Sequence, residues 1–181
     1  MTTYIGLLRG INVGKAKRIP MESLRNLLSN LGYTGVVTLL NSGNAVFQAE
    51  NKVPDNIASE ISTAISRQFQ MEVPVIIKSK ETLDAIVHEN NLANNAPDHS
   101  RLLVAFVQDS RDLTELEKII PLLANAEVFE ISHQAAYLHC VSGILNSKAA
   151  NALLGKHGKA ATTRNWATVL KLHALTSKNS E

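Results

Sequence analysis

The chain has an ordinary globular composition and a formal net charge of +2. With 181 residues it is long enough for one domain or two small ones. A single cysteine, Cys140, excludes an internal disulfide and favours a reducing compartment. The first residues show no charged and apolar leader and no apolar segment is long enough to span a membrane, so we expect a cytoplasmic protein without a membrane partner.

Charge is segregated along the chain. Residues 9–18 carry four cations and no acid, and residues 131–180 carry six cations and no acid. Because the whole chain carries +2 and these ten cations carry +10, the remaining residues carry −8. If the two basic ends meet in space, they present one positive face to phosphates or to an acidic partner.

The first predicted elements are a strand, a loop and a helix. Residues 4–9 are apolar on both faces, which is typical of a covered strand. Gly10 and Gly14 let the loop turn at positive φ, and Pro20 suits the first turn of a helix. Free N–H groups ahead of a helix favour an anion, which predicts a phosphate-binding loop. Residues 10–15 lack the spacing of a nucleotide-triphosphate loop, and the alternative is a turn with solvated lysines.

Apolar spacing and turn signals predict the other elements of the first half. A helix from Met21 stops at Gly32, and a turn at residues 41–44 separates the two strands of a hairpin. Pro54 opens a helix whose isoleucines lie four residues apart, and residues 73–78 form a closing strand. The order β-α-β-β-α-β within residues 1–79 predicts an α+β fold of the ferredoxin-like kind.

The second half repeats much of this order. A linking helix and a polar loop are expected at residues 80–100, followed by a second, less regular plait at residues 101–181. The expected elements of this second plait are a strand at 101–107, a hairpin at 127–141, a helix at 147–154 and a closing strand at 160–162. Asp112 with Glu115 predicts a capping box for a helix that Pro121 ends or kinks. Thr163 is expected to cap a last helix that carries Trp166.

Four motifs stand out: LLRGINVG at residues 7–14, Pro20-Met21, Ser42-Gly43-Asn44 with Phe47, and TTRNWATVLKL at residues 162–172. With them the chain resembles the bacterial domain-of-unknown-function family 1697 over nearly its whole length. The resemblance implies an α+β protein of two plait-like subdomains and no established activity. Lys15, where the family often has glycine, and Val141, where a proline is expected, depart from the pattern.

The residues predicted to bind a ligand lie in the glycine-bracketed loop, in the second turn or at the start of the last helix. They are Arg9, Asn12, Lys15, Lys17, Arg18, Ser42, Asn44, Arg164 and Asn165. Arg164 and Asn165 can face one anion together with the N–H groups of a helix start. Equally, Arg164 can bridge the two subdomains through a buried carboxylate.

Other reactive residues fit a structural role better. Cys140 and His139 point to opposite faces of a strand and cannot form a dyad, which favours a core cysteine. The six histidines show no metal spacing, no carboxylate pair matches a catalytic motif, and no cofactor is indicated. Trp166 lies on an apolar stripe, which favours a core role over stacking.

These patterns predict a cytosolic binding protein for a phosphorylated small molecule or nucleic acid, with the two basic ends forming one site at the junction of the subdomains. RNA recognition needs aromatic side chains on the strands, and only Tyr4, Phe47, Phe106 and Tyr137 are available, in no matching motif. The alternatives are an enzyme of unknown reaction with a polar site between the subdomains, and a structural adaptor. The sequence indicates no oligomeric state.

Overall fold

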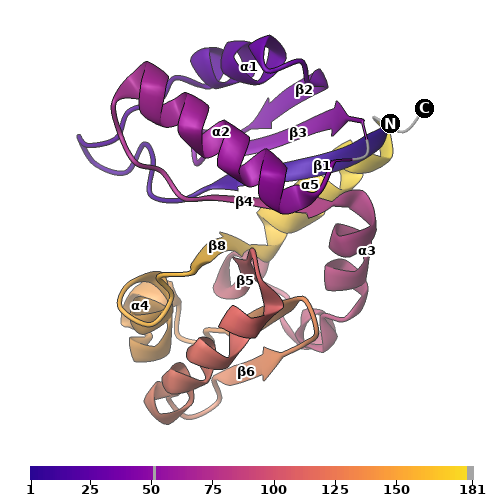
Figure 1. The fold of residues 1–181 in the computed structure, drawn as a ribbon. Coiled ribbons are helices and arrows are strands. Elements are labelled where there is room, and N and C mark those ends of the chain that lie inside the picture. Colours follow the sequence, from indigo (N-terminus) through magenta and orange to yellow (C-terminus); the bar gives the residue numbers. More distant parts are fainter. Residues whose placement is uncertain (51, 179–181) are drawn as a thin grey trace. The chain divides into compact units, whose positions relative to one another are not determined.

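The computed structural model describes residues 1–50 and 52–178 (Figure 1). Contacts within the chain divide it into two compact units. Unit 1 consists of residues 1–83 and the described residues from Leu172 onward, and unit 2 consists of residues 84–171. The divisions fall inside two helices, α3 (Lys80–His88) and α5 (Trp166–Lys178). The sequence assigned the whole of this last helix to the second subdomain, whereas in the structure its second half groups with unit 1.

Unit 1 contains a four-stranded antiparallel sheet in the order β2-β3-β1-β4. Its elements are β1 (Thr2–Leu8), α1 (Met21–Asn30), β2 (Thr34–Leu39), β3 (Asn44–Ala49), α2 (Pro54–Phe69) and β4 (Val75–Ser79). This is the predicted β-α-β-β-α-β order. Strand β1 is central, because Ile5 pairs with Val46 on one side and with Lys78 on the other.

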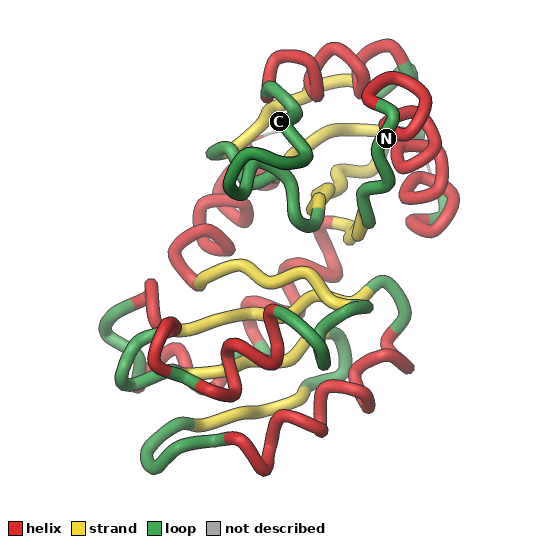
Figure 2. Tube along the Cα trace, turned by 90° about the vertical axis from the view of Figure 1, so that its left-hand side faces the viewer, coloured by secondary structure: helices red, strands yellow, loops and turns green. Residues whose placement is uncertain are grey.

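The core of unit 1 lies between its sheet and the helices α1 and α2, which cover one face of the sheet (Figures 1 and 2). Ile57, Ile61 and Ile65 are buried one turn apart along α2 and join the same cluster as Phe47 of β3. Spacing of four residues places these side chains on one side of a helix, and their burial is the main stabilising term for the element. The helix predicted from the isoleucines is therefore confirmed.

Unit 2 contains a second four-stranded antiparallel sheet, in the order β6-β7-β5-β8. Its strands and α-helix are β5 (Leu102–Val107), β6 (Val128–Ile131), β7 (Ala135–His139), α4 (Lys148–Leu154) and β8 (Ala161–Asn165). Its 3-10 helices are η1 (Asn91–Asn95), η2 (His99–Arg101), η3 (Ser110–Leu122) and η4 (Ile144–Asn146). The first strand of the unit is again central, and η3 and α4 pack on the core beneath the sheet.

Helix η3 corrects one expectation. Asp112 and Glu115 do not form the predicted capping box: the N-cap is Asp109, whose Oδ1 accepts a hydrogen bond from the N–H of Arg111 at 2.9 Å. The helix is 3-10 rather than α, and Leu113, Leu116 and Ile119 are buried at intervals of three residues. That interval matches the three residues per turn of a 3-10 helix, so one face meets the core throughout.

The end of the chain corrects a second expectation. The closing strand β8 extends to Asn165 rather than ending at residue 162, and Thr163 lies within it instead of capping the last helix. Asn165 takes the capping role, because its Oδ1 accepts a hydrogen bond from the N–H of Thr168 at 2.9 Å. Trp166, the first residue of α5, is only 4% exposed, in agreement with a core role.

Candidate functional site

The basic loop, residues 9–20, joins β1 to α1 in unit 1. Ile11 and Ile19 are buried in the core and anchor it at two points. Between them the backbone turns at positive φ at Gly14 and also at Asn12 and Lys17, where φ is 56° and 50°. Two residues with side chains in the left-handed region mark a backbone that its surroundings hold in place.

The side chain of Asn12 holds the loop together. Its Nδ2 donates to the carbonyl oxygens of Ile19 at 2.9 Å and Asn41 at 2.7 Å, and its Oδ1 accepts from the N–H of Ile19 at 2.9 Å. The amide thus closes the loop on itself and joins it to the β2–β3 turn, which contains Asn41. The sequence predicted Asn12 as a ligand-binding residue; in the structure its amide positions the loop, and Asn12 also lines a cavity described below.

The cations of the loop differ in their surroundings. Lys17 reaches the segment before β4, where its Nζ donates to the carbonyl of Glu72 at 2.8 Å. The backbone N–H of Arg9 donates to the carbonyl of Pro74 at 3.0 Å. Lys15 and Arg18 are exposed. Among the four cations of the loop, Arg18 lines the cavity described in the next paragraph.

A cavity of about 250 Å³ opens where the basic loop meets α1. It is lined by Asn12, Arg18, Ile19, Pro20, Met21 and Asn41. Pro20 is the N-cap of α1 and makes no capping hydrogen bond, since a proline ring offers no acceptor. The first N–H groups of a helix have no partner within the helix, and the helix dipole places partial positive charge there. A cation and an uncapped helix start therefore meet at one cavity, which we call the loop cavity.

Ser42 lies in the β2–β3 turn and Asn44 directly after it; both were predicted to bind a ligand, and Asn41 of the same turn lines the loop cavity. Asn44 is fully buried, and its Nδ2 donates to the carbonyl of Leu39 at 3.0 Å and to Ser42 Oγ at 2.9 Å. Gly43 has φ +82°, and a Cβ there would lie 2.6 Å from the Cβ of Leu8, so only glycine fits. The Ser42-Gly43-Asn44 motif thus packs the turn against β1, and it leaves the Ser42 hydroxyl at an exposed position.

The remaining predicted residues, Arg164 and Asn165, belong to unit 2. Arg164 is on β8 rather than at a helix start; its Nη1 donates to the carbonyl of Thr163 at 3.0 Å and to Thr162 Oγ1 at 3.4 Å. Burial lowers the pKa of the Arg164 guanidinium to about 10. Asn165 caps α5, as described above. A site shared by these residues and the basic loop stays a prediction.

Cys140 behaves as a core residue. It is completely buried, and burial raises the pKa of its thiol to about 11, which keeps it protonated at neutral pH. His139, its neighbour, is partly exposed. Among the described residues no group of three or more His, Cys, Asp or Glu is placed to hold a metal ion. No helix in the described part of the chain has the length and apolar character needed to cross a membrane.

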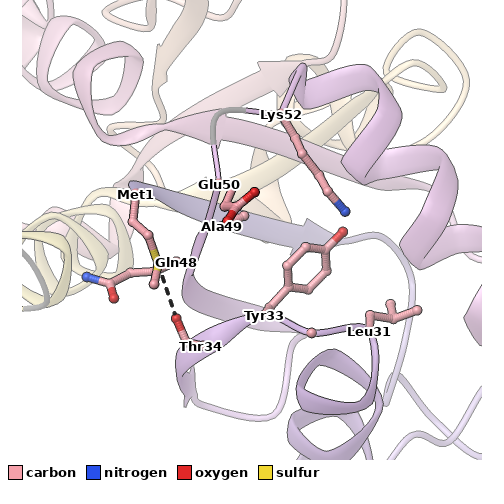
Figure 3. A pocket seen from close by; sticks show the side chains of 9 residues that line it. Met1, Leu31, Tyr33, Thr34, Gln48, Ala49, Glu50 and Lys52 are labelled. Carbon is pink, nitrogen blue, oxygen red and sulfur yellow. Dashed lines mark hydrogen bonds between the residues drawn. The ribbon is translucent and has the colours of Figure 1, made fainter.

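Figure 3 shows a second cavity of unit 1, about 240 Å³ in volume. The Tyr33 hydroxyl donates to Glu60 Oε2 at 2.6 Å, and Lys52 Nζ contacts the same oxygen at 3.1 Å. Lys52 also lies over the Tyr33 ring, 5.4 Å from its centroid. Burial, assisted by Glu60, raises the pKa of Tyr33, and the Tyr33 hydrogen bond lowers the pKa of Glu60. The polar groups of Tyr33, Lys52 and Glu60 are already paired with one another, so this cavity is a weaker candidate for a ligand site than the loop cavity.

Sequence reasoning missed Pro20, Met21, Asn41 and Ile19, which line the loop cavity. A signal for the first two was present. The helix that starts at Met21 has proline, and not Ser, Thr, Asp or Asn, as the preceding residue, which indicates a helix start without a side-chain cap. The contact between Asn12 and Asn41 joins residues 29 apart in sequence and has no local signature.

Comparisons with known proteins give one family, from a family model, and one similar fold, from a solved structure. The model of a family described as "Protein of unknown function (DUF1697)" matches residues 1–137. Among solved structures, the chain is similar to the conserved bacterial protein SP0830 from Streptococcus pneumoniae, with 24% sequence identity and a TM-score of 0.81. The match covers 97% of this chain and 98% of that chain, and it concerns the fold alone. No curated protein matches the chain.

Proposed function

This chain belongs to the DUF1697 family of proteins of unknown function, as its motifs indicated, and we propose that its loop cavity binds the phosphate group of a small phosphorylated molecule. One observation carries the proposal: the uncapped N-terminus of α1 opens on a cavity that Arg18 also lines. Unpaired backbone N–H groups, a helix dipole and a guanidinium are the three features that favour a bound phosphate.

The charge of the loop supports the same conclusion. Residues 9–18 contain four cations and no acid, so their summed field attracts anions toward the cavity mouth. Hydrogen bonds hold the loop backbone in the absence of a ligand, from the N–H of Asn12 to the carbonyl of Lys17 at 3.0 Å and from the N–H of Ile19 to Asn12 Oδ1 at 2.9 Å. Such preorganisation lowers the entropic cost of binding.

Cavity size and aromatic burial favour a small molecule over nucleic acid. At about 250 Å³ the cavity is at the small end of ligand sites and suits one phosphate group with little beyond it. Binding of single-stranded nucleic acid relies on exposed aromatic rings that stack on bases. Four aromatic side chains on the strands, Tyr4, Phe47, Phe106 and Tyr137, are at most 3% exposed. The other, Phe129 of β6, is partly buried and packs against the core of unit 2.

Two further inferences accompany this function. Each unit is a plait of the ferredoxin-like kind; the strand orders β2-β3-β1-β4 and β6-β7-β5-β8 support this. The protein acts in the cytoplasm, which its single buried cysteine supports.

Calorimetric titration with inorganic phosphate tests the proposed function. We expect saturable binding that weakens as salt is added, and binding at least about tenfold weaker in Arg18→Gln, because a charge-assisted hydrogen bond is lost. Lys156→Gln, which removes an exposed cation on unit 2, is the matched control and should bind as the wild type does. Equal binding by Arg18→Gln, or preference for a single-stranded oligonucleotide over phosphate, would contradict the proposal.

A further inference from the structure

Strand β6 forms an open edge of the sheet in unit 2. It is the first strand in the order β6-β7-β5-β8, so it has a neighbouring strand on one side only (Figure 1). Two apolar side chains of this strand are in part open to solvent, since Val128 is 41% exposed and Ile131 is 37% exposed. Backbone groups at such an edge can pair with a further strand. The edge is therefore a candidate surface for an added extended segment.

The hairpin determines which backbone groups of β6 point outward. The N–H of Ser132 donates to the carbonyl of Ala135 at 2.9 Å, which makes these two residues a hydrogen-bonded pair at the end of the β6–β7 hairpin. Hydrogen-bonded and non-hydrogen-bonded pairs alternate along an antiparallel ladder, so Glu130, two residues earlier, also bonds to β7. The N–H and carbonyl groups of Phe129 and Ile131 therefore point away from β7, toward the open edge. No residue in the described part of the chain bonds to these groups.

The edge of unit 1 at β2 differs in regularity. Strand β2 also pairs on one side only, but its register with β3 is broken between Thr34 and Val37. An irregularity of this kind twists an edge strand and protects it from pairing with another chain. Strand β6 pairs with β7 residue for residue from Val128 to Ile131, so it lacks this protection.

A cavity of about 410 Å³ adjoins β6 and carries negative charge. It lies where the end of α3 meets the β6–β7 hairpin, and its lining includes His88, Glu89, Glu130, Ile131 and His133. Among the described residues that line it, none is Lys or Arg. Because Glu130 is itself on β6, one of the two carboxylates lies on the open strand. The strand is therefore flanked by acids, and the two histidines add positive charge only when they are protonated.

We propose that β6 binds an extended segment of another protein in which a lysine or arginine lies between two apolar residues. The two apolar residues exchange backbone hydrogen bonds with Phe129 and Ile131, and the basic residue lies opposite Glu130. The basic side chain is then a direct cross-strand neighbour of the Glu130 carboxylate, which also lines the acidic cavity. Backbone hydrogen bonds supply affinity for any extended segment, and the charge of Glu130 selects a basic one.

A second copy of this chain fits the edge less well. If Phe129 and Ile131 of two copies bonded to each other in an antiparallel pair, the Glu130 carboxylates of the two copies would lie directly opposite each other. Like charges in that position destabilise a strand pair, whereas opposite charges stabilise it. The charge on β6 thus favours a basic partner over self-association.

Nuclear magnetic resonance titration of the full chain with the capped peptide Thr-Val-Lys-Val-Thr tests this proposal. It is run at pH 8, where histidine side chains carry little positive charge. We expect saturable shifts of the Phe129 and Ile131 amides. The same peptide with N-methylvaline at both valines has lost the donors that face β6, and it should bind at least about tenfold more weakly. The peptide with Glu in place of Lys should bind at least about fivefold more weakly, because it sets two carboxylates opposite each other.

Variants of β6 locate the contact. Ile131→Pro removes an N–H that points outward and leaves the bonds to β7 in place, so it should weaken binding about fivefold. Ile131→Val keeps this N–H and should bind like the wild type. Glu130→Gln should weaken binding at least about twofold, the effect of one exposed ion pair, whereas Glu117→Gln changes an exposed acid on η3 and should have no effect. Thermal melting checks that Ile131→Pro is folded, and if it is not, the three peptides decide the question on the wild type.

Several results would overturn the proposal. They are the absence of saturable shifts with the lysine peptide, equal binding of the N-methylated peptide, and equal binding of the lysine and glutamate peptides. Shifts of the Phe129 and Ile131 amides that grow with protein concentration alone would show that a second copy occupies the edge, and they would overturn it too. No phosphate is present in this titration, so its outcome is independent of the loop cavity.

Discussion

The side-chain amide of Asn12 donates a hydrogen bond to the backbone carbonyl of Asn41 at 2.7 Å, and this bond joins the basic loop to the β2–β3 turn. The same Nδ2 donates to Ile19, so one nitrogen serves two carbonyl oxygens. Asn12→Asp removes both donors and places a carboxylate oxygen against those carbonyls. We expect the free energy of unfolding to fall by about 2 kcal/mol, the usual cost of leaving such acceptors unpaired.

Urea unfolding of this variant measures the effect. Asn151→Asp is the control, because its side chain lies at an exposed position on α4 and its one hydrogen bond, to Leu145, is long at 3.5 Å. The control should change stability by less than about 0.5 kcal/mol. If both variants are equally stable, Asn12 does not hold the loop.

Gly43 should tolerate no side chain. A Cβ would lie 2.6 Å from Leu8 Cβ and 2.8 Å from Ile11 Cδ1, and φ is +82°. Gly43→Ala should therefore cost about 2 kcal/mol or more, from overlap and backbone strain together. Gly14→Ala separates the two causes: its φ is +63° but nothing lies within 4 Å of the added atom, so only about 1 kcal/mol is expected. Equal losses on thermal melting would show that the contact with Leu8 is unimportant.

Glu22 should oppose the bound anion. It is an exposed acid in the first turn of α1. There its negative charge interacts favourably with the helix dipole and stabilises the helix, but it repels a phosphate in the loop cavity. Glu22→Gln should bind phosphate more tightly while its stability falls by about 0.5 kcal/mol. Glu81→Gln makes the same change in the first turn of α3 and should leave phosphate binding unaltered. Weaker phosphate binding by Glu22→Gln would place the anion elsewhere.

Because of Cys140, the free energy of unfolding should depend on pH in the alkaline range. Burial raises the pKa of its thiol from 9.0 to about 11, so between these values the native protein keeps a proton that the unfolded chain releases. The free energy of unfolding should therefore decline as the pH rises through this range, because the unfolded state binds fewer protons. Cys140→Ala should show a shallower decline in urea unfolding from pH 9 to 11. An identical slope would mean that the thiol titrates normally in the fold.

The sequence predicted the first unit better than the second, for physical reasons. In unit 1 the apolar residues follow the periods of ordinary elements, such as the isoleucines four apart in α2. In unit 2, Leu113, Leu116 and Ile119 follow a period of three, which is typical of a 3-10 helix, whereas the sequence prediction for this helix rested on a capping box and on Pro121. Strand β8 continues beyond the predicted residues through Thr163, Arg164 and Asn165, and the polarity of these residues hid this part of an edge strand.

Part of the candidate site could be predicted from the sequence. Glycines and cations located the basic loop, since both signals are local. The loop cavity itself depends on Asn12 contacting Asn41 across 29 residues, which only the assembled fold shows, whereas the missing cap of α1 could be read from Pro20. The sequence also could not show that the amides of Asn44 and Asn165 make hydrogen bonds within the fold, because a buried or capping asparagine cannot be told from an exposed one by residue type.

The amide resonances of Met21, Glu22 and Ser23 test the central claim most directly, because their N–H groups begin α1 at the loop cavity. Nuclear magnetic resonance spectra are recorded as inorganic phosphate is added. The ionic strength is kept constant by removing chloride as phosphate is added. The account predicts saturable shifts of these three amides, with one dissociation constant that Arg18→Gln raises. Shifts confined to other residues, or equal shifts with chloride alone, would contradict a phosphate site at the start of α1.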